Sequence, residues 1–496
     1  MRQLARLAPL TSALALTVAI ANPVFAEPAY LGAEILVNSD TINDQERPAI
    51  ADTGDGGFVV AWESFATDGD NGGIMARRFG PTGSAIGGQF TVNTYVALRQ
   101  GAPKVSAASD GAFVVVWEGD IQDGVDYGVF GQRYDTAGAP LGTEFAINTH
   151  ITGNQQSPDV SVGASGEFVV VWSSQGQDGS GSGVIARLFG ADGLPASDEF
   201  VVNAYTSQGQ YFPRVDSNDD GSFVVVWASY DGRDGAGYGV FGQRFDGAGQ
   251  VLGTEFAVNT FTTADQNFPS VAMTEAGFVV AWQSLGVDGS NEGIAGRRYD
   301  AAGAPIGDEF VVNTYDLDSQ VHPDVVGDAA GGFVVAWDSI GLDGDGTALI
   351  AQRFDDTAVA DGLELLINTA FLGDQNEAAI AATPDGRFIV AWNSAEGDGS
   401  GTSIAAQRML LAPPQCGDAT EAPLSVVGRL PGGTPDLQLT ATDALVILNG
   451  SVGIGLCPLC VCDVNNSMSV TATDALIVLN AAIGVPQNLV CPNLCI

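Results

Sequence analysis

Basic residues are scarce in this 496-residue chain, which carries 18 lysines and arginines against 59 aspartates and glutamates. Lys104 is the only lysine, and the formal net charge is −41 at pH 7. Because nucleic acids and anionic lipid surfaces are bound by basic patches, this composition argues against both as partners. It suits divalent cations and neutral or cationic ligands.

Recognisable catalytic motifs are also missing. The chain has no GxSxG nucleophile elbow, HExxH zinc motif or phosphate-binding loop. Its two histidines, His150 and His322, have no recognisable partner in the sequence. A carboxylate pair could form a glycosidase site, but nothing in the sequence selects two acids among so many. The sequence therefore predicts no catalytic residue and no cofactor-binding residue.

Long apolar runs are confined to the N-terminus, where arginines precede a mostly apolar stretch from Leu7 to Ile20. Val24-Phe25-Ala26 then gives a cleavage site before Glu27, so residues 1–26 are predicted to be a signal peptide. No later stretch reaches the length of a membrane span. The mature protein is therefore expected to be secreted, in the extracellular space or at the cell surface.

Cysteine is absent before Cys416, and all six cysteines lie between Cys416 and Cys495. An even set crowded into the tail of an exported protein predicts a disulfide framework, although the sequence leaves the pairing open. The remainder of the chain is not predicted to be disordered. Its hydrophobic content is 45% and its charged fraction only 16%, so it can bury a core.

A repeat of 55 residues occupies most of the chain. The strand FVVAW or FVVVW, written FIVAW in the last copy, begins at Phe58, Phe113, Phe168, Phe223, Phe278, Phe333 and Phe388. All seven tryptophans close these strands, and core packing explains them better than sugar stacking. Each unit holds four short runs with strand character, separated by glycine, aspartate and asparagine, which is typical of a propeller blade.

Alternation within the tryptophan strand predicts how the blades pack. Phe113 and Trp117 face one side of the sheet, and the smaller Val114 and Val116 face the other. The large face of one blade can then pack on the small face of its neighbour. Repeating that contact seven times closes a ring.

The two ends of the repeat region complement each other. The last unit has three strands, ending at 404–409, and lacks a fourth, while residues 34–38 near the N-terminus match the fourth-strand pattern. The sequence thus predicts a mainly β protein, with a seven-bladed β-propeller over residues 31–411 that the N-terminal strand closes.

The VNT, DGSG and GQRFD phrases of the units resemble repeats of large secreted bacterial surface and calcium-dependent adhesion-type proteins. This resemblance covers about residues 31–411 and implies an extracellular setting, without assigning a function.

Aspartate-glycine loops follow each tryptophan strand, and a glutamine begins each following unit. We expect both on one rim of the ring, where carboxylate and amide oxygens would suit calcium. For any single Asp-Gly pair, a tight turn is the better explanation. The best ligand spacing is that of Asp68 with Asp70, and of Asp343 with Asp345.

Recurring arginines on the third strands, such as Arg133, and acids at the start of the fourth, such as Glu144, predict cross-strand ion pairs. Residues that break the repeat are candidates for a site. The departures are Arg233, Tyr127, Tyr238, His150 and His322.

Residues 412–496 open a new composition, in which the phrase TATDAL occurs twice, each time leading into an apolar run of helical character. A twelve-residue loop precedes the second copy, and its spacing is that of a calcium loop that starts a helix. The oxygen-bearing positions 1, 3, 5, 7, 9 and 12 are Asp463, Asn465, Ser467, Ser469, Thr471 and Asp474.

Duplicated loop-helix units of this form resemble the type I dockerin. The resemblance implies a small helical module that binds calcium and docks to a cohesin-like protein receptor. The loops depart from the pattern, with Met468 at the glycine position and only Asp436 and Asp443 as acids in the first loop. A disulfide-held helical pair without metal is the alternative, and Cys462 with Cys491 is the pairing that would clasp the second unit.

Three functions follow from these features. The first is a secreted binding or scaffold protein whose propeller rim recognises a glycan or a cell-surface partner and whose tail docks it. The second is an extracellular polysaccharide-degrading enzyme, either a glycoside hydrolase or a lyase, that carries a dockerin. The third is a structural surface-layer repeat, which would bind no ligand.

Overall fold

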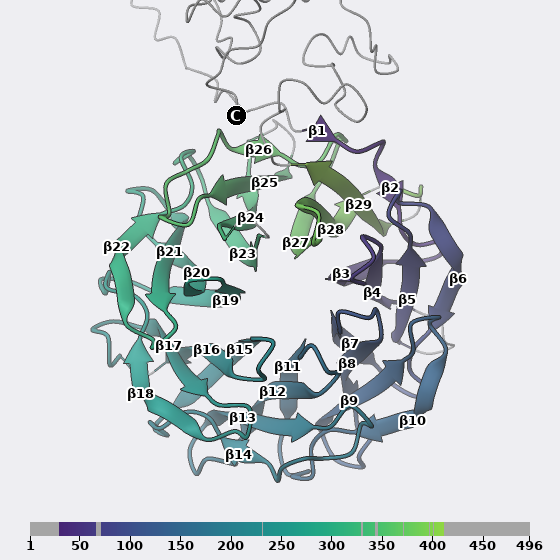
Figure 1. Cartoon of the computed structure of the whole chain (residues 1–496), viewed down its shortest axis with the longest axis horizontal. Coiled ribbons are helices and arrows are strands. Elements are labelled where there is room, and N and C mark those ends of the chain that lie inside the picture. The colour runs from purple at the N-terminus through teal and green to yellow at the C-terminus, as the bar shows by residue number, and fades with distance from the viewer. Residues whose placement is uncertain are drawn as a thin grey trace, which may run out of the picture.

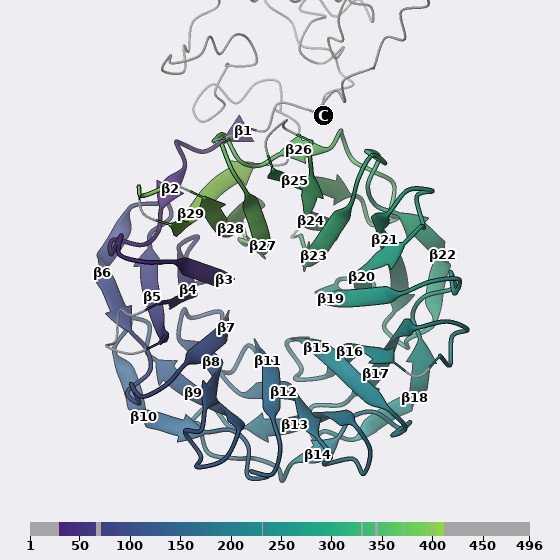
Figure 2. The same cartoon turned by 180° about the vertical axis from the view of Figure 1, so that it is seen from behind.

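The computed structural model describes residues 29–65, 71–230, 232–328, 331–342, 346–370, 372–395, 397–399 and 401–410. These residues form seven antiparallel sheets arranged in a ring, seen from its two sides in Figures 1 and 2. They contain no helix, and therefore none that could cross a membrane. The predicted signal peptide and C-terminal helical module lie outside the described residues.

Each sheet is a blade, and its strands follow one another from the axis of the ring outward (Figure 1). The innermost strands are β3 (Gln45–Asp52), β7 (Gln100–Ala107), β11 (Gln155–Val162), β15 (Gly209–Ser217), β19 (Gln266–Thr274), β23 (Gln320–Gly327) and β27 (Gln375–Ala382). The second strands carry the tryptophans and are β4 (Phe58–Ser64), β8 (Phe113–Asp120), β12 (Phe168–Gln175), β16 (Phe223–Tyr230), β20 (Gly277–Leu285), β24 (Phe333–Ile340) and β28 (Arg387–Ala395).

The third and outer strands complete the blades. The third strands are β5 (Gly73–Phe79), β9 (Tyr127–Tyr134), β13 (Ser182–Phe189), β17 (Tyr238–Phe245), β21 (Glu292–Asp300), β25 (Thr347–Phe354) and β29 (Thr402–Leu410). The outer strands are β6 (Ala85–Thr91), β10 (Pro140–Ala146), β14 (Phe200–Val201), β18 (Val251–Ala257), β22 (Pro305–Val311) and β26 (Leu365–Leu366). The seventh blade has β1 (Ala29–Tyr30) and β2 (Ile35–Leu36) at this place.

The hydrophobic core lies between blades, as the alternation predicts. Phe113 and Trp117 of the second blade pack against Val59 and Ala61 of the first. Val114, on the opposite face of the second blade, joins the cluster around Trp172 of the third. All seven tryptophans are 0–1% exposed, which confirms their core role. Because both faces of each blade are buried this way, the middle strands read as continuous apolar runs.

The N-terminal strand closes the ring. Ile35 pairs with Ala406, and the backbone N–H of Val37 donates to the Ile404 carbonyl at 2.8 Å. β1 also pairs with β29, at Tyr30 and Met409. The predicted closure is thereby confirmed, and the edge of β29 is covered rather than left open.

The predicted cross-strand ion pairs are wrong for the residues used to infer them. Glu144 accepts hydrogen bonds from the backbone N–H and hydroxyl of Thr94 in the preceding blade. Arg133 donates to the backbone carbonyls of Ala191 and Asp192 in the following blade. Both side chains instead satisfy backbone groups of an adjacent blade, because turns at the blade ends leave such groups without a ladder partner.

Candidate functional site

Every innermost strand is interrupted by a β-bulge at the same place, two residues after its first glutamine. The residue there has a φ of 48–55° in all seven blades, although it is never glycine. We call these residues the inner ring; they are Arg47, Ala102, Ser157, Phe212, Phe268, His322 and Glu377. A positive φ costs a non-glycine residue roughly 1–2 kcal/mol, and backbone strain of this kind clusters at functional sites.

In four of the seven blades the inner-ring backbone is held by the residue that follows the tryptophan in the preceding blade. The N–H of Ser157 donates to Glu118 Oε2 at 3.0 Å, and that of Glu377 donates to Asp338 Oδ2 at 3.0 Å. The N–H of Arg47 donates to an amide oxygen, Asn393 Oδ1, at 3.0 Å. These bonds fix the backbone, and the side chains differ from blade to blade. The inner ring is therefore where the repeat loses its symmetry.

Aromatic rings gather on one side of the inner ring, in blades four to six. Centroid distances between successive rings are 4.7, 6.3, 6.3, 4.7 and 5.1 Å. We call this chain the aromatic stripe; in order, it comprises Tyr230, Tyr238, Tyr211, Phe212, Phe268 and His322. Every member is partly exposed, and Tyr230 is 50% exposed. Partly exposed aromatic rings in a continuous row form an apolar surface of the kind that marks a binding site.

Charged groups occupy the opposite side, around blades one and two. Arg99, in the loop before β7, donates to both carboxylate oxygens of Glu63 at 2.6 and 2.7 Å and to Glu118 at 3.3 Å. The Glu63 side chain is fully buried. Burial opposes the positive charge of Arg99, but the two carboxylates outweigh it and raise the pKa of the guanidinium. Arg47 adds a longer contact, 3.5 Å to Glu63.

His322 joins the stripe to a buried acid. Its Nδ1 lies 3.0 Å from Asp338 Oδ2, and its side chain is 44% exposed. Burial lowers the pKa of His322, but the hydrogen bond and charge of Asp338 raise it more. Burial raises the pKa of Asp338. The sequence hypothesis that His322 has no partner is therefore wrong, because the partner is brought to it by strand pairing.

Glu46 lies beside the inner ring, close to the inner-ring residue Glu377. Burial raises the pKa of Glu46, and the charges of Glu377 and Glu63 raise it further. Glu377 accepts a hydrogen bond from Asn393 Nδ2 at 3.0 Å. A carboxyl with a raised pKa next to a second carboxyl is an arrangement that can take part in proton transfer.

Acids deeper in the innermost strands have a structural role. Asp159, Asp216 and Asp324 accept hydrogen bonds from the N–H groups of Val215 at 2.9 Å, Met273 at 2.7 Å and Ile380 at 3.0 Å. Each bond joins one innermost strand to the next, whose inward edge has no neighbouring strand. Burial raises the pKa of Asp216 to about 6.

The predicted rim of exposed oxygen ligands is wrong for the glutamines. All seven are 0% exposed, and Gln45, for example, accepts the indole N–H of Trp62 at 2.9 Å. The aspartates of the described Asp-Gly loops make turns and hold side chains of the VNT phrase. Asp123, Asp178, Asp234 and Asp288 each accept an asparagine amide N–H at 2.9–3.1 Å, from Asn148, Asn203, Asn259 and Asn313.

The residues proposed as calcium ligands lie outside the described residues. These are Asp68, Asp70, Asp343 and Asp345 in the propeller, and Asp436, Asp443, Asp463, Asn465, Ser467, Ser469, Thr471 and Asp474 in the tail. Within the described part, no three histidine, cysteine or acidic residues cluster closely enough to hold a metal ion.

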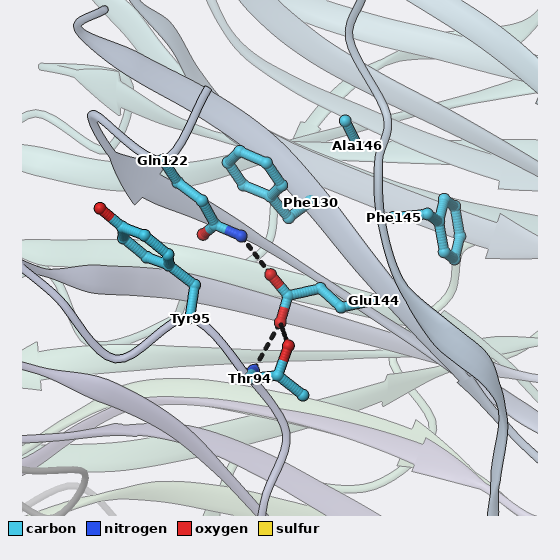
Figure 3. Close-up of a pocket in the computed structure, with 7 residues that line it drawn as sticks. All are labelled: Thr94, Tyr95, Gln122, Phe130, Glu144, Phe145 and Ala146. Carbon is cyan, nitrogen blue, oxygen red and sulfur yellow. Dashed lines mark hydrogen bonds between the residues drawn. The ribbon is translucent and has the colours of Figure 1, made fainter. Parts of the chain in front are cut away.

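An open depression of about 380 Å³ lies between the first two blades, beside Tyr95 and Glu144 (Figure 3). The Glu144 carboxylate is already bonded to Thr94 and to Gln122 Nε2. The same arrangement recurs one blade further on, where Glu199 bonds Thr149 and Gln177. This depression is therefore part of a repeating contact between blades.

No family model and no curated protein matches the chain. Among solved structures, a protein of unknown function from Dyadobacter fermentans is 12% identical with a TM-score of 0.47, over 79% of this chain and 100% of that one. An α-L-arabinofuranosidase from Fusarium graminearum is 14% identical with a TM-score of 0.44, over 62% and 92%. An α-L-arabinanase from Penicillium chrysogenum is 15% identical with a TM-score of 0.43, over 63% and 94%.

The chain's own strand order defines it as a seven-bladed β-propeller. Its distinctive region is the inner ring with the side chains beside it, which are aromatic around blades four to six and charged around blades one and two. Sequence reasoning found Tyr238 and His322 as departures from the repeat but missed Arg99, Phe212 and Phe268. Comparing the residue before the strand proline across the units would have found the two phenylalanines.

Proposed function

We propose that this protein binds a carbohydrate chain at the inner ring, with sugar rings stacked on the aromatic stripe. The observation that carries the proposal is the row of partly exposed rings through Tyr211, Phe212 and Phe268. The repeat does not require aromatic residues there, since other blades have alanine, serine or arginine. Ligand sites typically combine such apolar surface with a few placed polar groups.

Polar groups next to the stripe suit a hydroxyl-rich ligand. His322 lies at the end of the stripe, and Glu377 and Arg47 follow it in the next two blades of the inner ring. Carboxylates accept hydrogen bonds from hydroxyl groups, and guanidinium groups donate hydrogen bonds to hydroxyl oxygens. The proposed glycan site is thus nearer the axis than the rim expected from the sequence.

Isothermal titration calorimetry against a panel of soluble plant and microbial oligosaccharides tests the proposal. Phe212→Ala and Phe268→Ala should each weaken binding about tenfold or more, as for a central aromatic contact. Tyr95→Ala is the matched control, because it removes an aromatic ring from the depression between blades one and two. Loss of binding in the control, with both phenylalanine variants unchanged, would place the ligand elsewhere.

Cleavage of the bound chain is the second candidate function, and it would make the protein an extracellular polysaccharide-degrading enzyme. The supporting observation is the raised pKa of Glu46 beside Glu377, which suits an acid working with a base or nucleophile. Chromatography of reaction products should detect shortened chains, and both Glu46→Gln and Glu377→Gln should abolish them. If the wild-type protein leaves the polysaccharide intact, binding without cleavage is the remaining function. If no carbohydrate binds at all, the surface-layer alternative is favoured.

Residues 412–496 add a separate part of the proposal, namely calcium-dependent docking of a secreted protein to a cohesin-like receptor. It is supported by the loop spacing from Asp463 to Asp474. Calorimetry on the full chain should show calcium uptake that falls when Asp463→Ala and Asp474→Ala are combined. Unchanged uptake would direct attention to the propeller loops with Asp68, Asp70, Asp343 and Asp345.

A further inference from the structure

Arg233, one of the departures from the repeat, lies between two aromatic rings in the fourth blade. Its guanidinium carbon is 4.3 Å from the ring centroid of Tyr205 and 3.9 Å from that of Phe241. The same guanidinium forms an ion pair with the Glu255 carboxylate, and the Arg233 side chain is only 22% exposed. Two rings and a carboxylate around a planar cation form a cation–π site. In the fourth blade the chain fills that site with its own arginine.

The depression beside the second blade has the same three groups. The counterparts of Tyr205, Phe241 and Glu255 are Tyr95, Phe130 and Glu144. All three line the open depression of about 380 Å³ (Figure 3). Gln122 takes the place of the arginine, directly before the Asp-Gly pair, and its shorter side chain carries no charge. The second blade therefore has an open copy of the site that Arg233 fills.

The two rings occur together in these two blades only. In each blade, one residue of the third strand pairs with the tryptophan, and it is phenylalanine in the second and fourth blades. In the remaining five described third strands it is Met75, Ile185, Ala295, Ile350 or Ala405. The hydrogen bonds of the depression are thus a repeating contact between blades, but its aromatic walls are not.

The Gln122 amide is poorly satisfied in this place. Its Nε2 donates to Glu144, but its Oε1 is buried and has no hydrogen-bond donor among the described residues. In the third blade the Ser174 hydroxyl lies 2.7 Å from the equivalent oxygen, Gln177 Oε1. The second blade has Gly119 at that serine position, so the donor is missing. A buried acceptor without a donor is unfavourable, and a ligand that displaces the amide relieves this.

Glu144 also lacks a counter-charge. In the part of the chain that the structure describes, it forms no ion pair within 4 Å. Its Oε1 accepts the neutral amide of Gln122, whereas Glu255 Oε1 accepts the guanidinium of Arg233. An external guanidinium would make the same hydrogen bond with its charge added, and such charge-assisted bonds are the stronger ones.

We propose that this depression binds the guanidinium group of an arginine on a partner polypeptide, which displaces the Gln122 amide, packs against Tyr95 and Phe130 and pairs with Glu144. A guanidinium suits the site better than an ammonium because it is planar, stacks on aromatic rings and offers several donors to one carboxylate. The net charge of −41 favours the approach of a cationic partner. The depression shares no residue with the aromatic stripe, so the inference does not depend on carbohydrate binding.

Saturation-transfer difference nuclear magnetic resonance on the full chain tests the site. The probes are acetylated and amidated tripeptides with arginine, lysine or glutamine between two glycines. The arginine peptide should bind most tightly, and Tyr95→Ala should weaken its binding about fivefold. Gln122→Arg should abolish binding, because it supplies a guanidinium as Arg233 does. Tyr315→Ala is the matched control, since it removes a tyrosine at the same loop position of the sixth blade, where Ile350 replaces the second ring.

The outcomes separate this inference from the proposed function. Equal binding of the arginine and glutamine peptides, or undiminished binding by Gln122→Arg, would overturn the site. A lysine peptide that binds as tightly as the arginine peptide would overturn the choice of a guanidinium. Gln122→Arg should keep the wild-type thermal midpoint or exceed it, and Tyr95→Ala tests the site independently of that variant. Phe212→Ala should leave peptide binding unchanged, so each proposal can fail alone.

Discussion

Replacing Arg99 with methionine tests whether the charged side of the inner ring is held by its ion pairs. The substitution keeps most of the aliphatic stem but removes both hydrogen bonds to Glu63 and the contact with Glu118. Two buried carboxylates, with side chains 0% and 7% exposed, then lose their main counter-charge. Breaking a buried pair costs about 3–5 kcal/mol.

The lower end of that range applies, because Arg47 remains 3.5 Å from Glu63. Unfolding about 380 residues carries an entropy of about 0.8 kcal/mol/K, so a loss of about 3 kcal/mol lowers the midpoint by about 4 °C. Differential scanning calorimetry measures this shift. The double variant Glu63→Gln with Arg99→Met should be more stable than the sum of the single changes predicts, since it removes a buried charge.

Arg387→Met is the matched control. Its partner Asp385 is 46% exposed, and pairs of that kind contribute less than about 1 kcal/mol. Equal midpoints for the Arg99 and Arg387 variants, or strict additivity in the double variant, would refute the reasoning.

Three further predictions concern the propeller itself. Asp216→Asn should raise the thermal midpoint at pH 8 but not at pH 4. The folded pKa of Asp216 is raised from 3.8 to about 6, so the native state loses up to about 3 kcal/mol of stability as the pH rises through that interval. An equal effect at both pH values would contradict this prediction. Deleting residues 29–38 should lower the free energy of unfolding by at least about 2 kcal/mol, the contribution of the buried Val37 side chain. The deletion also exposes the edge of β29, so light scattering should detect association. A monomeric variant with an unchanged thermal midpoint would show that the closing strand does not stabilise the ring. Trp62→Phe should lower the free energy of unfolding, measured in urea, by about 1–3 kcal/mol more than Trp227→Phe does. The reason is that the Trp62 indole N–H has a glutamine acceptor, while that of Trp227 has none among the described residues. Equal losses would show that this hydrogen bond adds nothing.

Most of the fold was predictable because it is periodic. A 55-residue repeat containing Phe58 and Trp62 fixes the blade, and the alternation of large and small residues fixes how blades pack. The missing fourth strand of the last unit identified residues 34–38 as the closing strand. Each of these predictions depended on a local residue pattern or on the exact repetition of such a pattern along the chain.

The contacts between blades were predicted less well. Arg133 and Glu144 lie on paired strands, so an ion pair was the simplest expectation, yet each reaches an adjacent blade. The same limitation hid the pairing of Arg99 with Glu63 and of His322 with Asp338. Sequence spacing gives no measure of distance across a ring interface.

The sequence by itself determined a seven-fold, mainly β ring, its closure and its buried tryptophans, because local strand patterning and exact repetition leave few other ways to hide both faces of each sheet. Only the tertiary structure decided which side chains meet around the axis. Equivalent positions on seven separate strands converge there, so Phe212 and Phe268, 56 residues apart in the chain, have ring centroids 4.7 Å apart. Arg99 and Glu63, which belong to neighbouring blades, likewise meet there at 2.6 Å.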